Sequence, residues 1–272
     1  MQTPQPYQPG PPLQPGLRPD LIPQPSAPGA SDAVIVIQNL CKAFGTHVVL
    51  KDFSLTVGKE ENVVVLGRSG VGKSVLIKCI IGLLRPDSGR ILVFDRNIPD
   101  LDHEELDRIR AKVGFLFQSN ALYDSMTVRA NLEFPLRRHW ITISQSEIDA
   151  LVAEVLENVG LPETADMMPE ELSGGMRKRI ALARTLILKP EIILYDEPTT
   201  GLDPITGREI SRLIVDMQKK YHTASIIISH DMNCVKMTSD RIALLMDGKC
   251  YAQGPYEQLK DSADKNIHPF FE

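Results

Sequence analysis

The sequence lacks several features that would assign a protein to a broad functional class. No apolar run approaches the roughly 18 residues of a membrane span, so we expect work at a membrane to require docking to an embedded partner. The four cysteines are scattered without a Cys-x-x-Cys pair, which disfavours a zinc site or disulfide framework and favours reduced, mostly buried thiols in a cytosolic protein. A net charge of −5 offers no basic excess, so we expect no direct nucleic-acid binding.

The first 30 residues differ in composition from the rest of the chain. They hold ten of the twenty prolines and five glutamines, but one arginine and no lysine. Without a basic start and an apolar stretch they do not form a secretory signal, and they are too poor in arginine for an organellar transit peptide. Such a composition buries too little apolar surface to offset the cost of ordering, so we expect a disordered tail over residues 1–32. An inert extension is favoured over a segment that binds a partner's aromatic groove.

Residues 67–74 read Gly-Arg-Ser-Gly-Val-Gly-Lys-Ser and lie between two segments of different character. The apolar run 62–66 predicts a buried strand, and apolar residues after the loop recur at helical spacing. Glycines let the backbone wrap around an anion, and the following helix adds its positive N-terminal end. Lys73 is expected to reach the β- and γ-phosphates of a nucleoside triphosphate, and the Ser74 hydroxyl to ligate magnesium. The predicted nucleotide-binding residues here are Gly67, Arg68, Ser69, Gly70, Val71, Gly72, Lys73, Ser74 and Val75.

Polar side chains follow two further apolar runs. Asp196 ends the run that begins at 192, and His230 follows the run 225–228 after one serine. Because the carboxyl ends of parallel strands meet at one edge of a sheet, we expect both side chains beside the nucleotide. Asp196 is predicted to hold the water shell of the magnesium ion. Glu197 is predicted to be the general base that deprotonates the attacking water, while His230 contacts the γ-phosphate and fixes the geometry of Glu197.

Hydrophobic periodicity predicts an α/β fold around a central parallel sheet. Runs that are apolar at every position fit strands that are covered on both faces. The predicted strands are 34–40, 48–57, 62–66, 113–117, 192–195, 225–228 and 242–246. Asp102 followed by Glu105 predicts the start of a helix over 102–110, and the further predicted elements are a helix over 205–221 and a turn over 85–89. From about 119 to 188 the sequence is helical, with Ser146 as the expected N-cap of a helix that ends at Gly160.

A second anion-binding site is predicted within the helical stretch. Residues 172–176 read Leu-Ser-Gly-Gly-Met, and Ser173 lies 100 residues after Lys73. Ser173 is expected to cap a helix that starts at Gly174, so that its hydroxyl and the N–H groups of Gly174 and Gly175 can bind an anion. One chain cannot easily fold this helix end onto its own γ-phosphate while keeping the sheet intact. The arrangement becomes possible in a dimer of two facing copies. Each copy then supplies this helix end to the nucleotide of the other copy.

The order of these motifs resembles the ATP-binding subunits of ABC transporters over residues 34–254. The resemblance identifies 67–74 as a Walker A loop, 192–196 as a Walker B strand and 172–176 as the signature. It implies catalytic roles for Glu197, His230, Gln118 and Lys73, magnesium ligation by Ser74, Gln118 and Asp196, adenine stacking by Phe44, and a D-loop role for Asp203. The implied fold is a P-loop NTPase (RecA-like) core with an N-terminal antiparallel β subdomain and an inserted α-helical subdomain. The corresponding division is a nucleotide-binding core over 33–118 and 189–256, a helical subdomain over 119–188 and a short C-terminal tail over 257–272.

The resemblance also implies how such a protein works. ATP and Mg²⁺ are the implied cofactors; ATP closes a homodimer through two shared sites and pulls on a membrane permease dimer, and hydrolysis reopens it. The segments 117–123, 126–128, 131–137 and 203–207, together with Met176, are similar to the Mla/Mce lipid-transport ATPases of bacteria. That similarity implies phospholipid transport at the cytoplasmic side of the bacterial inner membrane, with an Mce-type lipid-binding protein in the complex. We expect the permease to contact the loop 121–136 through exposed Tyr123 and Met126.

Three alternatives remain open at this point. A transporter head of the same kind could serve amino acids, metal ions or lipoprotein release. An ABC ATPase that acts on nucleic acid or ribosomes is disfavoured, because the chain has one head, no heptad run, no zinc spacing and an acidic charge balance. A P-loop kinase is disfavoured because it has no need of the sequence Leu-Ser-Gly-Gly-Met.

Overall fold

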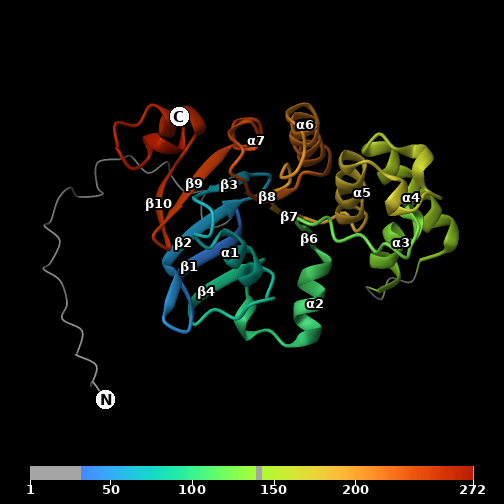
Figure 1. Cartoon of the computed structure of the whole chain (residues 1–272). Coiled ribbons are helices and arrows are strands. Elements are labelled where there is room, and N and C mark those ends of the chain that lie inside the picture. The colour runs from blue at the N-terminus through green and yellow to red at the C-terminus, as the bar shows by residue number, and fades with distance from the viewer. Residues whose placement is uncertain (1–31, 139–142, 272) are drawn as a thin grey trace, which may run out of the picture.

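Residues 32–138 and 143–271 are described by a computed structural model of the chain (Figure 1). The prediction of a disordered tail concerns residues outside these ranges, apart from Asp32. No helix within the described ranges is both long and apolar enough to cross a membrane. The described residues form two sheets, with helices on and beside them.

A six-stranded sheet is the predicted parallel core. Its strand order is β10-β9-β3-β8-β7-β6; the strands from β9 to β6 are parallel, and β10 runs antiparallel to β9. The strands are β3 (Asn62–Leu66), β6 (Val113–Leu116), β7 (Ile192–Asp196), β8 (Ala224–Ile228), β9 (Arg241–Met246) and β10 (Lys249–Gly254). Because β3, β8 and β7 are neighbours, the loops that follow them meet at one edge of the sheet. The sequence did not predict β10.

A four-stranded antiparallel sheet forms the predicted N-terminal β subdomain, in the order β2-β1-β4-β5. Its strands are β1 (Ala33–Phe44), β2 (His47–Gly58), β4 (Ser88–Val93) and β5 (Arg96–Asn97). The predicted turn over 85–89 is wrong at its end, because Ser88 and Gly89 already belong to β4. Gly89 has a φ of +95°, and a Cβ there would lie 2.5 Å from the carbonyl oxygen of Asn39. Glycine is therefore needed for β4 to approach β1 this closely.

The described residues also contain eight α-helices: α1 (Lys73–Ile80), α2 (His103–Ala111), α3 (Val128–Arg138), α4 (Gln145–Asn158), α5 (Gly174–Leu186), α6 (Pro204–Tyr221), α7 (Met232–Thr238) and α8 (Tyr256–Lys260). Asp102 caps α2 as predicted. The predicted cap of α4 is wrong: Ser144, not Ser146, accepts the N–H of Glu147, and Glu147 bonds back to complete a capping box. Ser146 instead lies in the first helical turn.

Two hydrophobic cores lie on the two faces of the parallel sheet. Successive residues of β3 point to opposite sides, so Val63 and Val65 join a core with the antiparallel sheet and α1, while Val64 joins a core with α5, α6 and α7. Helices α3, α4 and α5 share a third core, which lies to one side of the sheets in Figure 1. The parallel strands are thus covered on both faces, which explains why their sequences are mostly apolar along their length.

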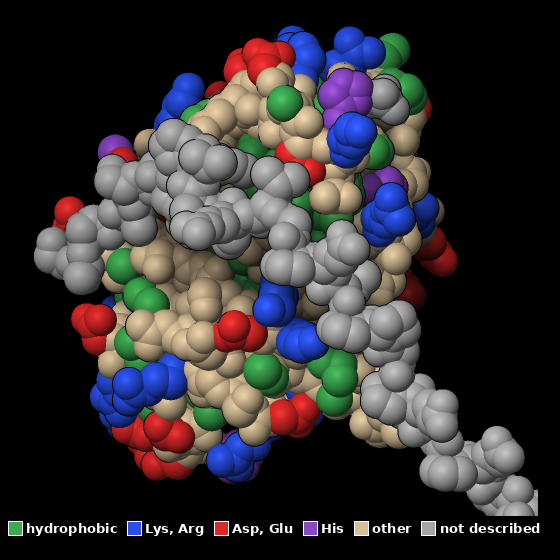
Figure 2. Space-filling view, turned by 90° about the vertical axis from the view of Figure 1, so that its left-hand side faces the viewer, with side chains coloured by type: hydrophobic (Ala, Val, Ile, Leu, Met, Phe, Trp, Pro, Cys, Tyr) green, Lys and Arg blue, Asp and Glu red, His purple; other side chains and the backbone are tan. Residues whose placement is uncertain are grey.

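The surface carries charges of both signs. Figure 2 shows acidic and basic side chains interspersed over the face that it presents. All four cysteines are free; Cys79 and Cys234 are buried, and Cys41 and Cys250 are half-buried. Tyr123 is exposed as expected, whereas Met126 is half-buried, so the expectation that Met126 is exposed is wrong.

Candidate functional site: a nucleotide pocket at the edge of the parallel sheet

The loop after β3 curls around the ammonium group of Lys73. Gly72, with a φ of 112°, turns the chain into α1, and Lys73 is the first residue of that helix. The Lys73 side chain is buried, and its Nζ donates to the carbonyl oxygens of Gly67 at 2.7 Å and Arg68 at 3.1 Å. Burial lowers the pKa of Lys73, against the attraction of Glu197 and Asp196. The loop therefore holds a positive charge where its N–H groups and the N-terminus of α1 favour an anion.

Ser74 and Asp196 bring two oxygen atoms together beneath this loop. The Ser74 hydroxyl donates to Oδ1 of Asp196 at 3.1 Å, which joins α1 to the end of β7. Burial raises the pKa of the Asp196 carboxyl, and the Ser74 hydrogen bond partly opposes that shift. A buried carboxylate beside a hydroxyl oxygen is stabilised by a cation, and such oxygen donors, completed by phosphates and water, suit Mg²⁺. The residues present therefore fit a magnesium ion.

Glu197 and His230 form a hydrogen-bonded pair across the ends of β7 and β8. The Nδ1 atom of His230 lies 2.8 Å from Oε2 of Glu197, and the Thr200 hydroxyl donates to the same oxygen at 3.3 Å. The Glu197 N–H donates to the carbonyl of Ile228 at 2.9 Å, and the glutamate has a φ of +51°. A left-handed conformation is unusual for a non-glycine residue. Here β8 holds the N–H of Glu197, and His230 and Thr200 hold its carboxylate. The carboxylate is thereby held in one orientation.

These groups line one cavity of about 480 Å³. Such a volume lies in the range of small-molecule and cofactor sites. Ten residues predicted from the sequence line it: Phe44, Ser69, Gly70, Gly72, Lys73, Ser74, Val75, Gln118, Glu197 and His230. Phe44 is 49% exposed at the rim, where a flat ring can stack on a base. Asp196 reaches the cavity through Ser74, and the N–H of Val71 donates to the Arg68 carbonyl at 3.3 Å within the loop.

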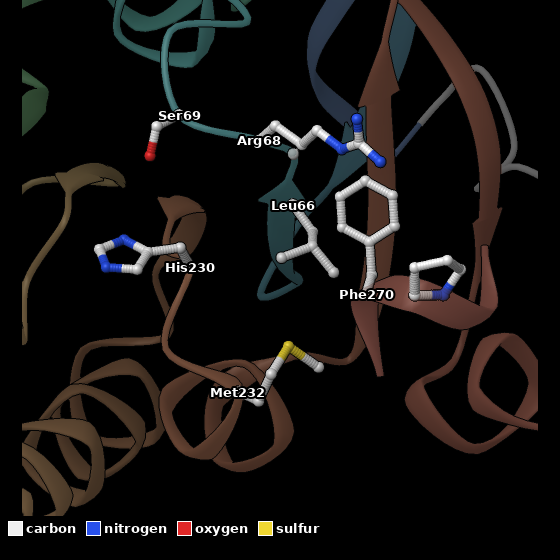
Figure 3. A pocket seen from close by; sticks show the side chains of 8 residues that line it. Leu66, Arg68, Ser69, His230, Met232 and Phe270 are labelled. Carbon is white, nitrogen blue, oxygen red and sulfur yellow. The ribbon is translucent and has the colours of Figure 1, made fainter. Parts of the chain in front are cut away.

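A smaller cavity of about 200 Å³ adjoins the loop on its other side. Gly67 lines it, and Figure 3 shows the side chains of Arg68, His230, Met232 and Phe270 arranged around it. Phe270 belongs to a short turn, His268–Phe270, that is anchored by fully buried Ile267. The segment 257–272, which the sequence analysis treats as a tail, thus contributes a wall next to the phosphate loop.

The signature residues and Asp203 lie outside the residues that line the nucleotide cavity. Ser173 caps α5 as predicted and accepts the N–H of Met176 at 3.2 Å. Asp203 caps α6, and its carboxylate accepts the Thr206 hydroxyl at 2.6 Å, which lowers its pKa. A Cβ on Gly175 would lie 2.7 Å from the Thr206 side chain, so the two helix starts pack against each other. The structure therefore places these predicted residues on a neighbouring surface and not in the cavity of the same chain.

Some residues of the site escaped the sequence analysis. Thr200 bonds to Glu197, and His47 and Val49 line the cavity from β2. Lys178 of α5 is 2% exposed, donates to the main-chain oxygen of Gln118 at 3.1 Å, and has its pKa lowered to about 8 by burial. Lys178 lies four residues before Leu182 and therefore on the buried side of α5. A charged residue at such a position is the signal in the sequence that could have identified Lys178.

Comparisons with known proteins agree with this geometry. Residues 50–200 match the family model described as ABC transporter. The chain is 40% identical to the probable ribonucleotide transport ATP-binding protein mkl of Mycobacterium leprae, over 87% of this chain and 68% of that protein. It is 38% identical to the intermembrane phospholipid transport system ATP-binding protein MlaF of Haemophilus influenzae, over 87% of this chain and 89% of that protein.

The chain is also similar to a relative whose name gives another substrate and to a solved structure. The methionine import ATP-binding protein MetN of Mesorhizobium japonicum is 38% identical, over 86% of this chain and 63% of that protein. The dimeric structure of MJ0796, a bacterial ABC transporter cassette, superposes with a TM-score of 0.75 at 32% identity and covers 81% of this chain and 98% of that one. Motifs, cavity and relatives agree that the chain belongs to the ABC transporter family, as one of its ATP-hydrolysing subunits.

Proposed function

We propose that this chain is the ATPase subunit of a phospholipid transporter of the bacterial envelope. It works as a homodimer on the cytoplasmic face of the inner membrane, bound to a permease dimer and to an Mce-type lipid-binding protein. The observation that carries the ATPase part is the oriented Glu197–His230 pair in one cavity with Lys73 and Ser74, where Ser74 is hydrogen-bonded to Asp196. The similarity to MlaF over 89% of its length supports the phospholipid part.

Each site residue has a role that its position supports. The Walker A loop residues 67–75 hold the phosphates through N–H groups, Lys73 binds the β- and γ-phosphates, and Phe44 stacks on adenine. Ser74, Asp196 and Gln118 hold Mg²⁺, which neutralises charge on the phosphates when it is bound.

The remaining roles concern the attacking water and the second copy. Glu197 accepts a proton from that water, and His230 keeps the carboxylate in place while it contacts the γ-phosphate. Ser173, Gly174 and Gly175 act on the nucleotide of the partner copy, next to Asp203.

A transporter for another substrate is the second candidate, because MetN is 38% identical to this chain. The test begins with the tagged chain purified from native membranes under mild detergent, followed by identification of the proteins that accompany it. The isolated complex is then placed in vesicles and supplied with ATP. We expect a permease and a lipid-binding subunit, and ATP-dependent transfer of a fluorescent phospholipid that is lost with Glu197→Gln. ATP-dependent methionine uptake without lipid transfer would support the second candidate instead.

A further inference from the structure

Helix α5 reaches the segment after β6 with two positively charged side chains. Lys178 donates from Nζ to the main-chain oxygen of Gln118 at 3.1 Å. Arg184, six residues later on α5, donates to the main-chain oxygens of Asn120 at 3.1 Å and Ala121 at 2.8 Å. Three of the four residues 118–121 are therefore held through their carbonyls by the helix that begins with the signature.

The burial of Lys178 makes this contact unusual. The side chain is 2% exposed, and the nearby charge that attracts it is Asp196 of β7. An ammonium group without water is unfavourable unless hydrogen bonds and opposite charge compensate. Leu182, four residues further along α5, lies in the apolar core, and an aliphatic residue would suit position 178 as well. Burial of the Lys178 ammonium group therefore lowers the stability of the fold at the point where this side chain reaches from α5 to the nucleotide site.

The backbone of the held segment is in a conformation that needs support. Asn120 and Ala121 have φ values of 63° and 51°, in the left-handed region that non-glycine residues rarely adopt. This conformation turns their carbonyls toward Arg184, which is itself largely withdrawn from water and has its pKa lowered by burial. Lys178 and Arg184 are the side chains of α5 that donate hydrogen bonds to residues 118–121. These hydrogen bonds offset the cost of the left-handed backbone conformation.

We propose that Lys178 and Arg184 are positioning residues that join residues 118–121 to α5 as one rigid unit. Gln118 lines the nucleotide cavity of its own chain, whereas Ser173, which caps the start of α5, is not one of the residues that line it. In the proposed dimer, contact of Ser173 with the partner's nucleotide is thereby transmitted along α5 to Gln118. The two ATP sites are coupled through Lys178. The inference rests on the proposed function, because it uses both the shared sites and the role of Gln118.

The first test compares Lys178→Met with Lys219→Met, a matched change of an exposed lysine on α6. We expect Lys178→Met to lower the rate of ATP hydrolysis about ten- to hundredfold, as a misplaced group does. Binding of a fluorescent ATP analogue without Mg²⁺ should change less than about twofold, since the phosphate loop is untouched. Lys178→Gln keeps a donor for the Gln118 carbonyl, so it should lose less activity than Lys178→Met. Lys219→Met should behave as the original chain.

Hydrogen exchange gives a readout that does not depend on hydrolysis. In Lys178→Met without nucleotide, amides of 118–121 should exchange about tenfold faster, while those of β3 and α1 stay unchanged. A purely structural lysine would instead loosen α5 and the sheet beneath it together. Unchanged exchange at 118–121, or faster exchange over the whole core, would overturn the inference.

A double-mutant cycle separates the inference from the proposed function. If Lys178 acts through Gln118, adding Lys178→Met to Gln118→Ala should lower hydrolysis no further. Losses that multiply would refute the coupling while leaving the proposed role of Gln118 intact. Should Gln118→Ala alone hydrolyse ATP at the original rate, the proposed role of Gln118 is wrong, and the exchange experiment still decides whether Lys178 holds the segment.

Discussion

Substitution of Glu197 by glutamine tests catalysis at this site separately from folding and nucleotide binding. Glu197 is 9% exposed, and its Oε2 atom lies 2.8 Å from Nδ1 of His230 and 3.3 Å from the Thr200 hydroxyl oxygen. Glutamine keeps the shape and one oxygen acceptor, so we expect the free energy of unfolding to change by less than about 1 kcal/mol. The amide cannot take a proton from water. Hydrolysis should therefore fall about 10²- to 10⁴-fold, a rise of about 3–5 kcal/mol in the barrier.

The assay for Glu197→Gln needs three measurements on one preparation. Phosphate release gives the rate, a fluorescent ATP analogue gives the affinity, and light scattering gives the mass with ATP bound. We expect slow hydrolysis, ATP affinity within about threefold of the original chain, and a dimer that persists with ATP. Glu157→Gln, an exposed change on α4, is the control and should alter none of them.

Two results would refute different parts of this reasoning. Phosphate release by Glu197→Gln at the original rate would show that Glu197 is not the general base. Slow hydrolysis by a protein that stays monomeric with ATP, even within its membrane complex, would leave the base in place but contradict the shared-site dimer.

Three further changes test other parts of the site and fold. Lys73→Ala should weaken ATP binding by about 2–3 kcal/mol, or roughly 30- to 150-fold, because a charge-assisted contact to phosphate is lost; titration with a fluorescent analogue measures it. Ser173→Arg should abolish hydrolysis, and mixing it with the Lys73 variant should restore at most one site per dimer; no recovery despite subunit exchange contradicts the shared site. Gly89→Ala should lower the free energy of unfolding by about 2 kcal/mol or more in urea, with ATP affinity unchanged; wild-type stability would refute the close β1–β4 contact.

The predicted parts of the fold are those whose signals lie in one continuous stretch. Strand β3 is buried at all five positions and apolar at the last four, and it directly precedes the glycine-rich loop, so both were predicted within a residue or two. The capping boxes show the limit of such signals. Asp102 was recognised by the glutamate three residues later, whereas for α4 the sequence offered Ser144 and Ser146, and only Ser144 has its glutamate at that spacing.

The parts that escaped prediction depend on contacts between distant segments. Strand β4 begins with Ser-Gly-Arg, which reads as a turn, and is a strand because β1 pairs with it. The C-terminal turn lines a cavity beside the phosphate loop because Ile267 and Phe270 pack on the sheet. A lysine is usually assigned to the surface, and the hydrogen-bond partner of Lys178, the main-chain oxygen of Gln118, is 60 residues away in the sequence. Local propensity carries no information about such pairings.

The hydrogen bonds at the start of α5 indicate what that helix can still bind. Ser173 accepts the N–H of Met176 with its hydroxyl oxygen and keeps its O–H as a donor, whereas the Asp203 carboxylate accepts the N–H and hydroxyl of Thr206 in the first turn of α6. The N–H groups of Gly174 and Gly175 belong to the first turn of α5, where an α-helix has no internal acceptor for them. They lie at the positive end of the helix, and their own chain's nucleotide cavity is lined by other residues. In the proposed dimer, the anion that binds them is the triphosphate of the second copy, whose charge fits this helix end.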